Sequence, residues 1–230
     1  MNRLDSDELK ALYDGKYARQ LDSRDHERRL RCLVDKIELK SSFEVVDFGC
    51  GSGALLDLLF RRVRSYTGVD FSPAFIEIAG TRLERLGVGN ATFVCSSIED
   101  FCATHRESFD AAFAFDFSEH VYDDEWIAIL ECIRGSLKRS GRLYLHTPNA
   151  EFVLEIMKAR NFMLRQSREH IAVRNRDQNA RLLERAGYSV RRAEFVPHYN
   201  VQRLVHRFSN IPLVGRYLKA RIFIEARVRP

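Results

Sequence analysis

Residues 45–56 read VVDFGCGSGALL, an apolar run that passes through a glycine-rich stretch and returns to an apolar one. The run FEVVDFG (43–49) is typical of a buried strand, and SGALLDLLFRR (52–62) is typical of a helix. Gly49 and Gly51 allow the backbone to turn sharply and to approach a ligand without a clash from Cβ. The stretch therefore predicts a strand, a ligand-binding turn and a helix with unpaired N–H groups at its start.

Strand-like and helix-like runs alternate on both sides of this unit. Ser72 and Pro73 mark the start of one helix, and Gly87 marks its end. This alternation predicts an α/β fold: a doubly wound, mostly parallel seven-stranded sheet with helices on both faces. The expected strands are 43–49, 65–71, 91–95, 109–115, 141–147, 188–196 and 219–228. The expected helices are 5–21, 25–37, 52–62, 73–87, 98–105, 123–137, 150–160 and 177–187.

The length and composition indicate one soluble globular domain over residues 1–230, with an N-terminal helical segment at 1–40. The chain is 45% hydrophobic and 30% charged, and no apolar run approaches the ~20 residues of a membrane span. The first ten residues are acidic and polar, which excludes a signal peptide. The five cysteines are scattered without a C-x-x-C pair, as expected of reduced thiols in a cytoplasmic protein.

The charge is distributed unevenly along the chain. Residues 1–150 carry a net charge of −5 and residues 151–230 a net charge of +10, within a total of +5. The basic C-terminal third indicates either an anionic partner or an ordinary solvated arginine-rich face.

Two acidic residues constrain the ligand of the glycine-rich turn. The segment GCGSGA fits the loose G-x-G-x-x-G/A form of dinucleotide-binding turns, but Asp47 precedes it and would repel a pyrophosphate. Asp70 ends the second strand about 20 residues later, where an acid can accept hydrogen bonds from a ribose diol. The two acids favour a ligand that carries a ribose and a positive charge instead of phosphates.

S-adenosylmethionine (SAM) is such a ligand, and the chain resembles the class I SAM-dependent methyltransferases over about residues 40–195. VVDFGCGSG resembles the first motif of that family, and GVDFS resembles its second-strand acidic motif. CSSIEDF resembles the segment beside the adenine, and FDAAFAFDFSEHV the fourth-strand motif. A doubly wound fold with another nucleotide ligand is the remaining structural alternative.

The resemblance implies a set of cofactor-binding residues. Asp47 would line the methionine end of SAM together with the turn residues Gly49, Cys50 and Gly51, while Gly53 packs the start of the helix. Asp70 would hold the ribose hydroxyls. The adenine would lie among Phe71, Ser97 (where the family often has Asp) and the backbone N–H of Ile98, while Phe115 would meet the ligand through its main-chain atoms at the end of the fourth strand. Tyr13 and Tyr17, in the 1–40 segment, would either close over the cofactor as a lid or pack as ordinary helix residues.

The acceptor side carries a second group of polar residues. DFSEHV supplies Asp116, Glu119 and His120, whose spacing puts them on one face of a helical turn. REHIAV supplies His170. The catalytic candidates are His120, Glu119 and His170, with His120 or His170 as the general base of a metal-free reaction. LHTPN adds Asn149 and also His146, for which a hydrogen-bonded structural role is expected.

This order of motifs resembles two subgroups of the family. One is the ubiquinone-biosynthesis type of O-methyltransferase, and the other is the small-RNA 2′-O-methyltransferases, in which E-x-x-E-H and a distal His hold a divalent cation. The second likeness implies Asp116, Glu119, His120 and His170 as ligands of Mg²⁺ or Mn²⁺. The shorter Asp116 stands where those subgroups have Glu.

Residues 197–217 form an insertion between the last two expected strands. An apolar stripe flanked by basic residues there indicates peripheral contact with a membrane, a cap on a lipophilic substrate, or a helix packed on the sheet edge. The resulting hypothesis is a cytoplasmic, membrane-associated SAM-dependent O-methyltransferase of a small phenol, catechol-like or sugar hydroxyl. The alternatives are RNA 2′-O-methylation, N-methylation and a SAM-binding protein without catalysis. No nucleic-acid partner is expected, because no RNA-binding module is recognisable.

Overall fold

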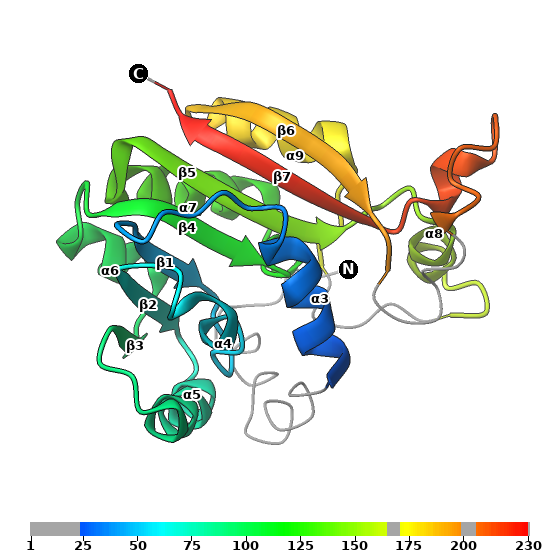
Figure 1. The fold of residues 1–230 in the computed structure, drawn as a ribbon. Coiled ribbons are helices and arrows are strands. Elements are labelled where there is room, and N and C mark those ends of the chain that lie inside the picture. The colour runs from blue at the N-terminus through cyan, green and yellow to red at the C-terminus, as the bar shows by residue number, and fades with distance from the viewer. Residues whose placement is uncertain (1–23, 165–170, 199–205, 230) are drawn as a thin grey trace.

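The sheet contains seven strands in the order β3-β2-β1-β4-β5-β7-β6. This computed structural model describes residues 24–164, 171–198 and 206–229 (Figure 1). Strands β1 to β5 are parallel neighbours, and β7 runs antiparallel to both β5 and β6. The predicted fold class is thereby confirmed. The strands are β1 (Glu44–Phe48), β2 (Ser65–Asp70), β3 (Ala91–Cys95), β4 (Phe109–Phe115), β5 (Leu137–Pro148), β6 (Tyr188–Val196) and β7 (Arg221–Val228).

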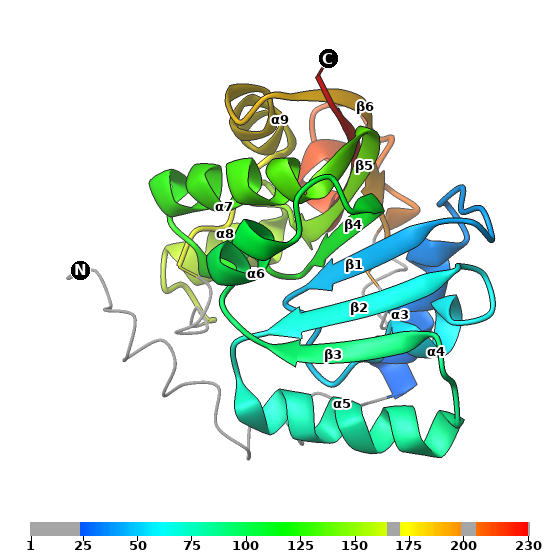
Figure 2. The same ribbon diagram turned by 90° about the vertical axis from the view of Figure 1, so that its left-hand side faces the viewer.

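Helices cover both faces of the sheet (Figure 2). One face is packed by α3 (Arg24–Val34) and α4 (Leu56–Leu59), with α5 (Pro73–Leu86) running along β2 and β3. The other face is packed by α6 (Ile98–Thr104), α7 (Asp123–Ser136) and α9 (Arg176–Arg185). The short helix α8 (Val153–Ala159) follows β5. No helix in the described part of the chain is long and apolar enough to cross a membrane.

The strand side chains pack into two separate hydrophobic cores, one on each face of the sheet. Successive side chains of a strand point to opposite faces, so Val45 and Phe113 pack under α3 and α4, whereas Val46 and Ala112 pack under α6 and α7. All four side chains are fully buried. The near-continuous apolar character of these strands therefore follows from burial on both faces.

Helix α5 begins and ends where its sequence predicts. Ser72 adopts an extended backbone and its side chain accepts a hydrogen bond from the N–H of Phe75, while Pro73 occupies the first turn. Gly87 ends the helix in a left-handed conformation with φ of 60°. The start of α5 lies beside the glycine-rich turn, because Asp70 accepts hydrogen bonds from the N–H groups of both Gly51 and Ser72, so the N-cap residue Ser72 also helps to position the site.

Among the described elements, two differ from the expected bounds by four residues at one end, and the others differ by less. The helix after the glycine-rich turn spans only Leu56–Leu59, because Gly53 has a φ of 72° and prolongs the turn. Strand β5 begins at Leu137 instead of residue 141, since Leu137 already pairs with Phe109 before the register shifts. Both differences arise from backbone geometry around turns, which residue patterns specify weakly.

Candidate functional site

The glycine-rich turn follows β1 and crosses the carboxyl end of β2. Gly49, Gly51 and Gly53 all have left-handed backbones, with φ of 67°, 52° and 72°. A Cβ at Gly49 would lie 2.7 Å from Cδ2 of Phe117. At Gly53 it would lie 2.4 Å from Cζ of Phe93. The turn therefore requires glycine for its dihedral angles and also for the close approach of two aromatic rings.

Asp70 holds this turn to the start of α5. Its carboxylate accepts a hydrogen bond from the N–H of Gly51 at 2.9 Å and another from the N–H of Ser72 at 2.9 Å. Burial raises the pKa of Asp70, and the two N–H donors oppose that shift. The acid thus positions two loops at the carboxyl ends of β1 and β2, where ligands of doubly wound sheets bind.

Asp47 is buried at the end of β1 and accepts a hydrogen bond from the Tyr66 hydroxyl at 2.7 Å. Burial raises the pKa of Asp47 to about 7, against the lowering effect of the Tyr66 hydrogen bond and with a smaller raising effect of Asp70. Burial also raises the pKa of the nearby Cys50 thiol. A cationic group bound beside Asp47 would be stabilised by its ionised form.

Two of the predicted cofactor residues, Ser97 and Ile98, lie at the start of α6. Ser97 is the N-cap of this helix and accepts a hydrogen bond from the N–H of Asp100 at 3.1 Å. Its hydroxyl donates to Oδ2 of Asp100 at 2.8 Å, so the side chain is engaged in capping. Ile98 is buried, and Phe71 is partly buried beyond the end of β2. The ring of Phe115 contacts the rings of Phe113 and His146. The side chain is therefore packed against its neighbours, and the part of Phe115 that can meet a ligand is its main chain at the end of β4.

Asp116 lies directly after β4 and is surrounded by two guanidinium groups and an imidazole. Its carboxylate pairs with Nη1 of Arg29 on α3 at 2.6 Å, with Nδ1 of His146 at 2.9 Å, and with Arg221 at the start of β7. Although burial acts in the opposite direction, these partners hold the pKa of Asp116 well below its usual range. Asp116 is therefore ionised and joins three elements distant in sequence. His146 has the structural, hydrogen-bonded role expected for it.

Glu119 lies in the 3-10 turn η1 (Ser118–His120) and is almost fully buried. Its Oε2 accepts a hydrogen bond from the Thr147 hydroxyl at 3.0 Å. Burial raises the pKa of Glu119, the charge of Asp116 raises it further, and His120 and Arg221 lower it. The sequence-predicted residues Asp116, Glu119 and His120 thus come together, whereas His170, Tyr13 and Tyr17 lie outside the described residues.

The donor set on this side does not suit a divalent cation at Asp116, since that carboxylate is already paired with two guanidinium groups. Among the described residues, no three side chains of His, Cys, Asp or Glu are arranged to hold a metal ion.

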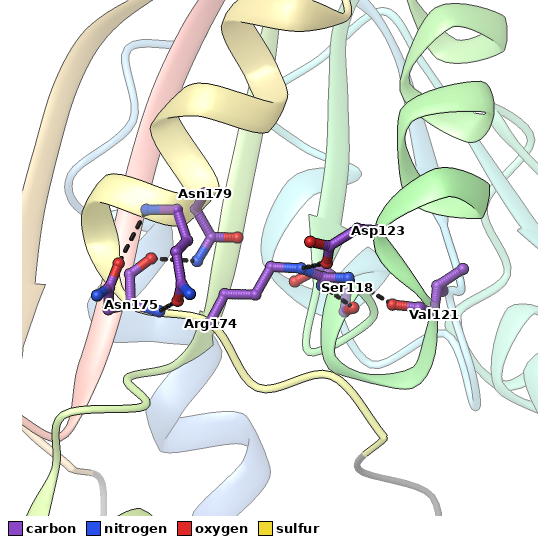
Figure 3. A network of polar contacts seen from close by, with 7 residues as sticks. Ser118, Val121, Asp123, Arg174, Asn175 and Asn179 are labelled. Carbon is purple, nitrogen blue, oxygen red and sulfur yellow. Dashed lines mark hydrogen bonds and ion pairs between the residues drawn. The ribbon is translucent and has the colours of Figure 1, made fainter. Parts of the chain in front are cut away.

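Arg174 fixes the turn that carries Glu119 (Figure 3). Its guanidinium donates to the carbonyl oxygens of Ser118 and Val121, both at 2.6 Å, and to Oδ1 of Asp123 at 2.7 Å. One residue further, Asn175 caps α9 in a reciprocal pair with Gln178. The arginine is buried and ties the segment before α9 to the turn after β4.

Sequence reasoning did not find Arg29, Arg174, Arg221 or Thr147. All four lie in or next to elements that the sequence does predict. Arg29 lies within a helix, Arg174 just before the N-cap of α9, Arg221 at the start of the last strand and Thr147 near the end of β5. Nothing in the local sequence distinguishes these arginines from the solvated ones, because their partners lie 51 to 105 positions away. Asn149 was noted, and its side chain donates to the carbonyl oxygen of Lys219 at 2.7 Å.

A family model described as a methyltransferase domain matches residues 17–193. The chain belongs to the class I SAM-dependent methyltransferase family. The geometry described above thus belongs to a methyltransferase domain.

Two curated relatives are named ubiquinone biosynthesis O-methyltransferases. The protein of Xanthomonas euvesicatoria is 33% identical over 135 residues, covering 57% of this chain and 54% of the relative. The protein of Xylella fastidiosa strain 9a5c is 35% identical over 135 residues, covering 57% and 53%. The chain spans about half the length of the curated relatives it matches.

Solved structures share the fold at low sequence identity. A SAM-dependent methyltransferase from Aquifex aeolicus matches with a TM-score of 0.70 and 16% identity, covering 94% of this chain and 99% of that one. A Haloferax volcanii putative methyltransferase complexed with the Trm112 activator matches with a TM-score of 0.73 and 15% identity, each chain being fully covered. These likenesses support the methyltransferase fold of this chain.

Proposed function

We propose that this methyltransferase transfers the methyl group of SAM to the hydroxyl of a small molecule. The observation that carries the proposal is Glu119, a buried carboxyl with a raised pKa at the ends of β4 and β5. A carboxyl of this kind suits the removal of a proton from an acceptor hydroxyl. The names of the curated relatives favour a phenol or catechol-like acceptor over a sugar.

SAM would bind along the carboxyl ends of β1, β2 and β4, and it supplies an activated methyl group on a sulfonium centre. Asp47 would complement its positive charge, with Gly49, Cys50 and Gly51 lining the methionine end. Asp70 would accept from the ribose. The adenine would lie among Phe71, Ser97 and Ile98, and the main chain of Phe115 would meet the ligand at the end of β4. Since the side chain of Ser97 already caps α6, we expect its contribution to come from the backbone.

Glu119, His120 and His170 would form the catalytic group. His120 lies close enough to Glu119 to lower the pKa of that carboxyl. The segment that follows His170 in the sequence reaches Glu119, because the N–H of Ala172 donates to the Glu119 carbonyl oxygen at 3.0 Å. This contact supports the proposal that His170 acts at the same site. We expect Glu119 or one of the histidines to accept the acceptor proton.

The test is a methyl-transfer assay on simple catechols and phenols with the full chain. Glu119→Gln should lower turnover at least a hundredfold, whereas Glu99→Gln, a matched change on the exposed face of α6, should not. Equal turnover in both variants would contradict the role of Glu119. A chelator is the second arm: loss of turnover that Mg²⁺ or Mn²⁺ restores would support the predicted ligands Asp116, Glu119, His120 and His170. Unchanged turnover would support the metal-free version.

We also propose that the whole chain works as one methyltransferase domain in which residues 1–40 form a lid. The ion pair between Arg29 of α3 and Asp116 supports this, since it connects that segment to the acceptor side. For localisation, we propose a cytoplasmic protein that contacts the membrane peripherally through 197–217. Residues 206–217 support this contact, because they expose several large apolar side chains. RNA is not proposed as an acceptor.

A further inference from the structure

Large exposed apolar side chains are confined to two short segments of the described chain. The first segment is 160–164 and the second is 206–216, and together they are called the apolar edge here. Leu213 is 92% exposed and Met163 is 82% exposed. The remaining members are Phe162, Leu164, Phe208, Ile211 and Val214. Single exposed apolar residues are normal on a surface, whereas their concentration in two segments indicates an interaction site.

The two segments lie at the same end of the molecule. Residues 160–164 follow α8, and residues 206–216 lie before β7 and include the start of η2 (Gly215–Leu218). The chain just before α8 is joined to the chain just after η2. Asn149 donates its side-chain amide to the Lys219 carbonyl and its N–H to the Ala220 carbonyl. Figure 1 shows α8 and the segment before β7 projecting together beyond the sheet. One flat partner can therefore contact both segments.

The backbone of the apolar edge presents its most exposed side chains in an uncommon conformation. Met163 has a φ of 58° and Leu213 a φ of 67°, in the left-handed region that bulky residues rarely adopt. Hydrogen bonds hold both turns: the N–H of Phe162 donates to the Met157 carbonyl at 2.9 Å, and that of Gly215 donates to the Ile211 carbonyl at 2.8 Å. Strain of this kind at a solvent-facing tip is typical of a functional position.

The charges beside the apolar edge are basic. Arg160, Arg207 and Arg216 are exposed within the two segments. Neither 156–164 nor 206–219 contains an aspartate or a glutamate. Exposed apolar residues that are interleaved with arginine and lack acids complement the anionic headgroups and acyl boundary of a lipid surface.

We propose that the apolar edge is a docking surface for an anionic lipid bilayer, which Met163 and Leu213 enter while the arginines contact the headgroups. The membrane contact proposed above involves residues 197–217 alone. The present proposal adds residues 160–164 to the contact surface and specifies that the lipid is anionic. It rests on that contact but not on methyl transfer, so vesicle binding tests it even where no acceptor is methylated.

The experiment is sedimentation of the full chain with phosphatidylcholine vesicles, with and without phosphatidylglycerol. We expect binding to the anionic vesicles that weakens with added salt. Met163→Asp and Leu213→Asp should each weaken it about tenfold. Arg207→Gln should weaken it about fivefold. The controls are Ala103→Asp on the exposed face of α6 and Arg139→Gln near the start of β5, at the opposite end of the sheet, and both should bind normally.

Three results would overturn the proposal. The first is an unmodified chain that fails to bind anionic vesicles, and the second is normal binding by both aspartate variants. The third is a dimer in light scattering that Leu213→Asp converts to a monomer without any change in vesicle binding, since the apolar edge would then be an interface between two copies. Circular dichroism of each variant checks that the fold is intact. We expect every variant to fold, because the substituted side chains are exposed.

Discussion

The hydroxyl of Tyr66 donates a hydrogen bond to Oδ2 of Asp47 at 2.7 Å. Tyr66 lies in β2, and Asp47 lies near the end of the neighbouring strand β1. The pair lies within the buried part of the SAM side and keeps the pKa of Asp47 lower than burial alone would. The ionisation of Asp47, and with it the complement to a cationic ligand, therefore depends on a residue of β2.

We predict that SAM affinity rises with pH through neutrality. With a pKa of about 7, Asp47 is about 10% ionised at pH 6 and about 90% at pH 8, so the affinity should rise about ninefold. Tyr66→Phe removes a hydrogen bond that lowers this pKa, and the rise should then occur at higher pH. Calorimetric titration with SAM between pH 6 and pH 9 measures both effects.

Tyr188→Phe is the matched control, because Tyr188 is also buried and donates its hydroxyl to the Leu130 carbonyl, on the other face of the sheet. It should lower stability without moving the pH dependence. An affinity that is independent of pH in the unmodified chain would remove the electrostatic role of Asp47.

Asp70→Asn should weaken SAM binding by about tenfold to a hundredfold. The amide cannot accept from both Gly51 and Ser72 as the carboxylate does, and it offers a ribose diol no charge. Ser72→Ala removes only the N-cap of α5, so it should cost about 1 kcal/mol of stability while SAM affinity is retained. Calorimetry and urea unfolding separate the two effects, and equal affinity losses in both variants would assign Asp70 a structural role alone.

Thr147→Val should shift the acidic limb of the pH–rate profile to higher pH. The Thr147 hydroxyl donates to Glu119, so its loss should raise the pKa of that carboxyl further and leave less of it ionised at low pH. The rate on the high-pH plateau should stay within about twofold of the original. Thr67→Val on β2 serves as the control, and an unshifted profile in Thr147→Val would argue against Glu119 as the titrating base.

Arg174→Ala should destabilise the fold by about 3 kcal/mol, because it removes a buried guanidinium that donates to the carbonyl oxygens of Ser118 and Val121. Urea denaturation measures this loss. The control is Arg181→Ala, because Arg181 is an exposed arginine on α9, the helix that follows Arg174. This change should alter stability by less than about 0.5 kcal/mol. Similar midpoints for the two variants would show that the buried arginine does not hold the turn.

Gly53→Ala should cost more stability than Gly87→Ala, although both glycines have left-handed backbones. The added methyl group would lie 2.4 Å from the Phe93 ring at Gly53, whereas at Gly87 nothing lies within 4 Å. We expect about 1 kcal/mol at Gly87 from the backbone alone and a further 1–3 kcal/mol at Gly53 from overpacking. Thermal unfolding of the two variants gives the comparison, and equal melting temperatures would contradict it.

The sequence by itself determined the fold class and the local turns and caps. Helix starts, glycine turns and apolar strands are local patterns, so Ser72, Gly87 and the turn at 49–53 could be read from neighbours within a few positions. Asp47 and Asp70 could likewise be predicted, because parallel strands end at one edge of the sheet.

Tertiary structure alone decided the partners on the acceptor side. Asp116 could be singled out as a candidate ligand, but only the fold brings Arg29 from α3 and Arg221 from β7 to its carboxylate. The same holds for Arg174, which reaches back across more than fifty positions to the turn of Glu119. Burial of a charge depends on where distant segments meet, and the local sequence does not encode that meeting.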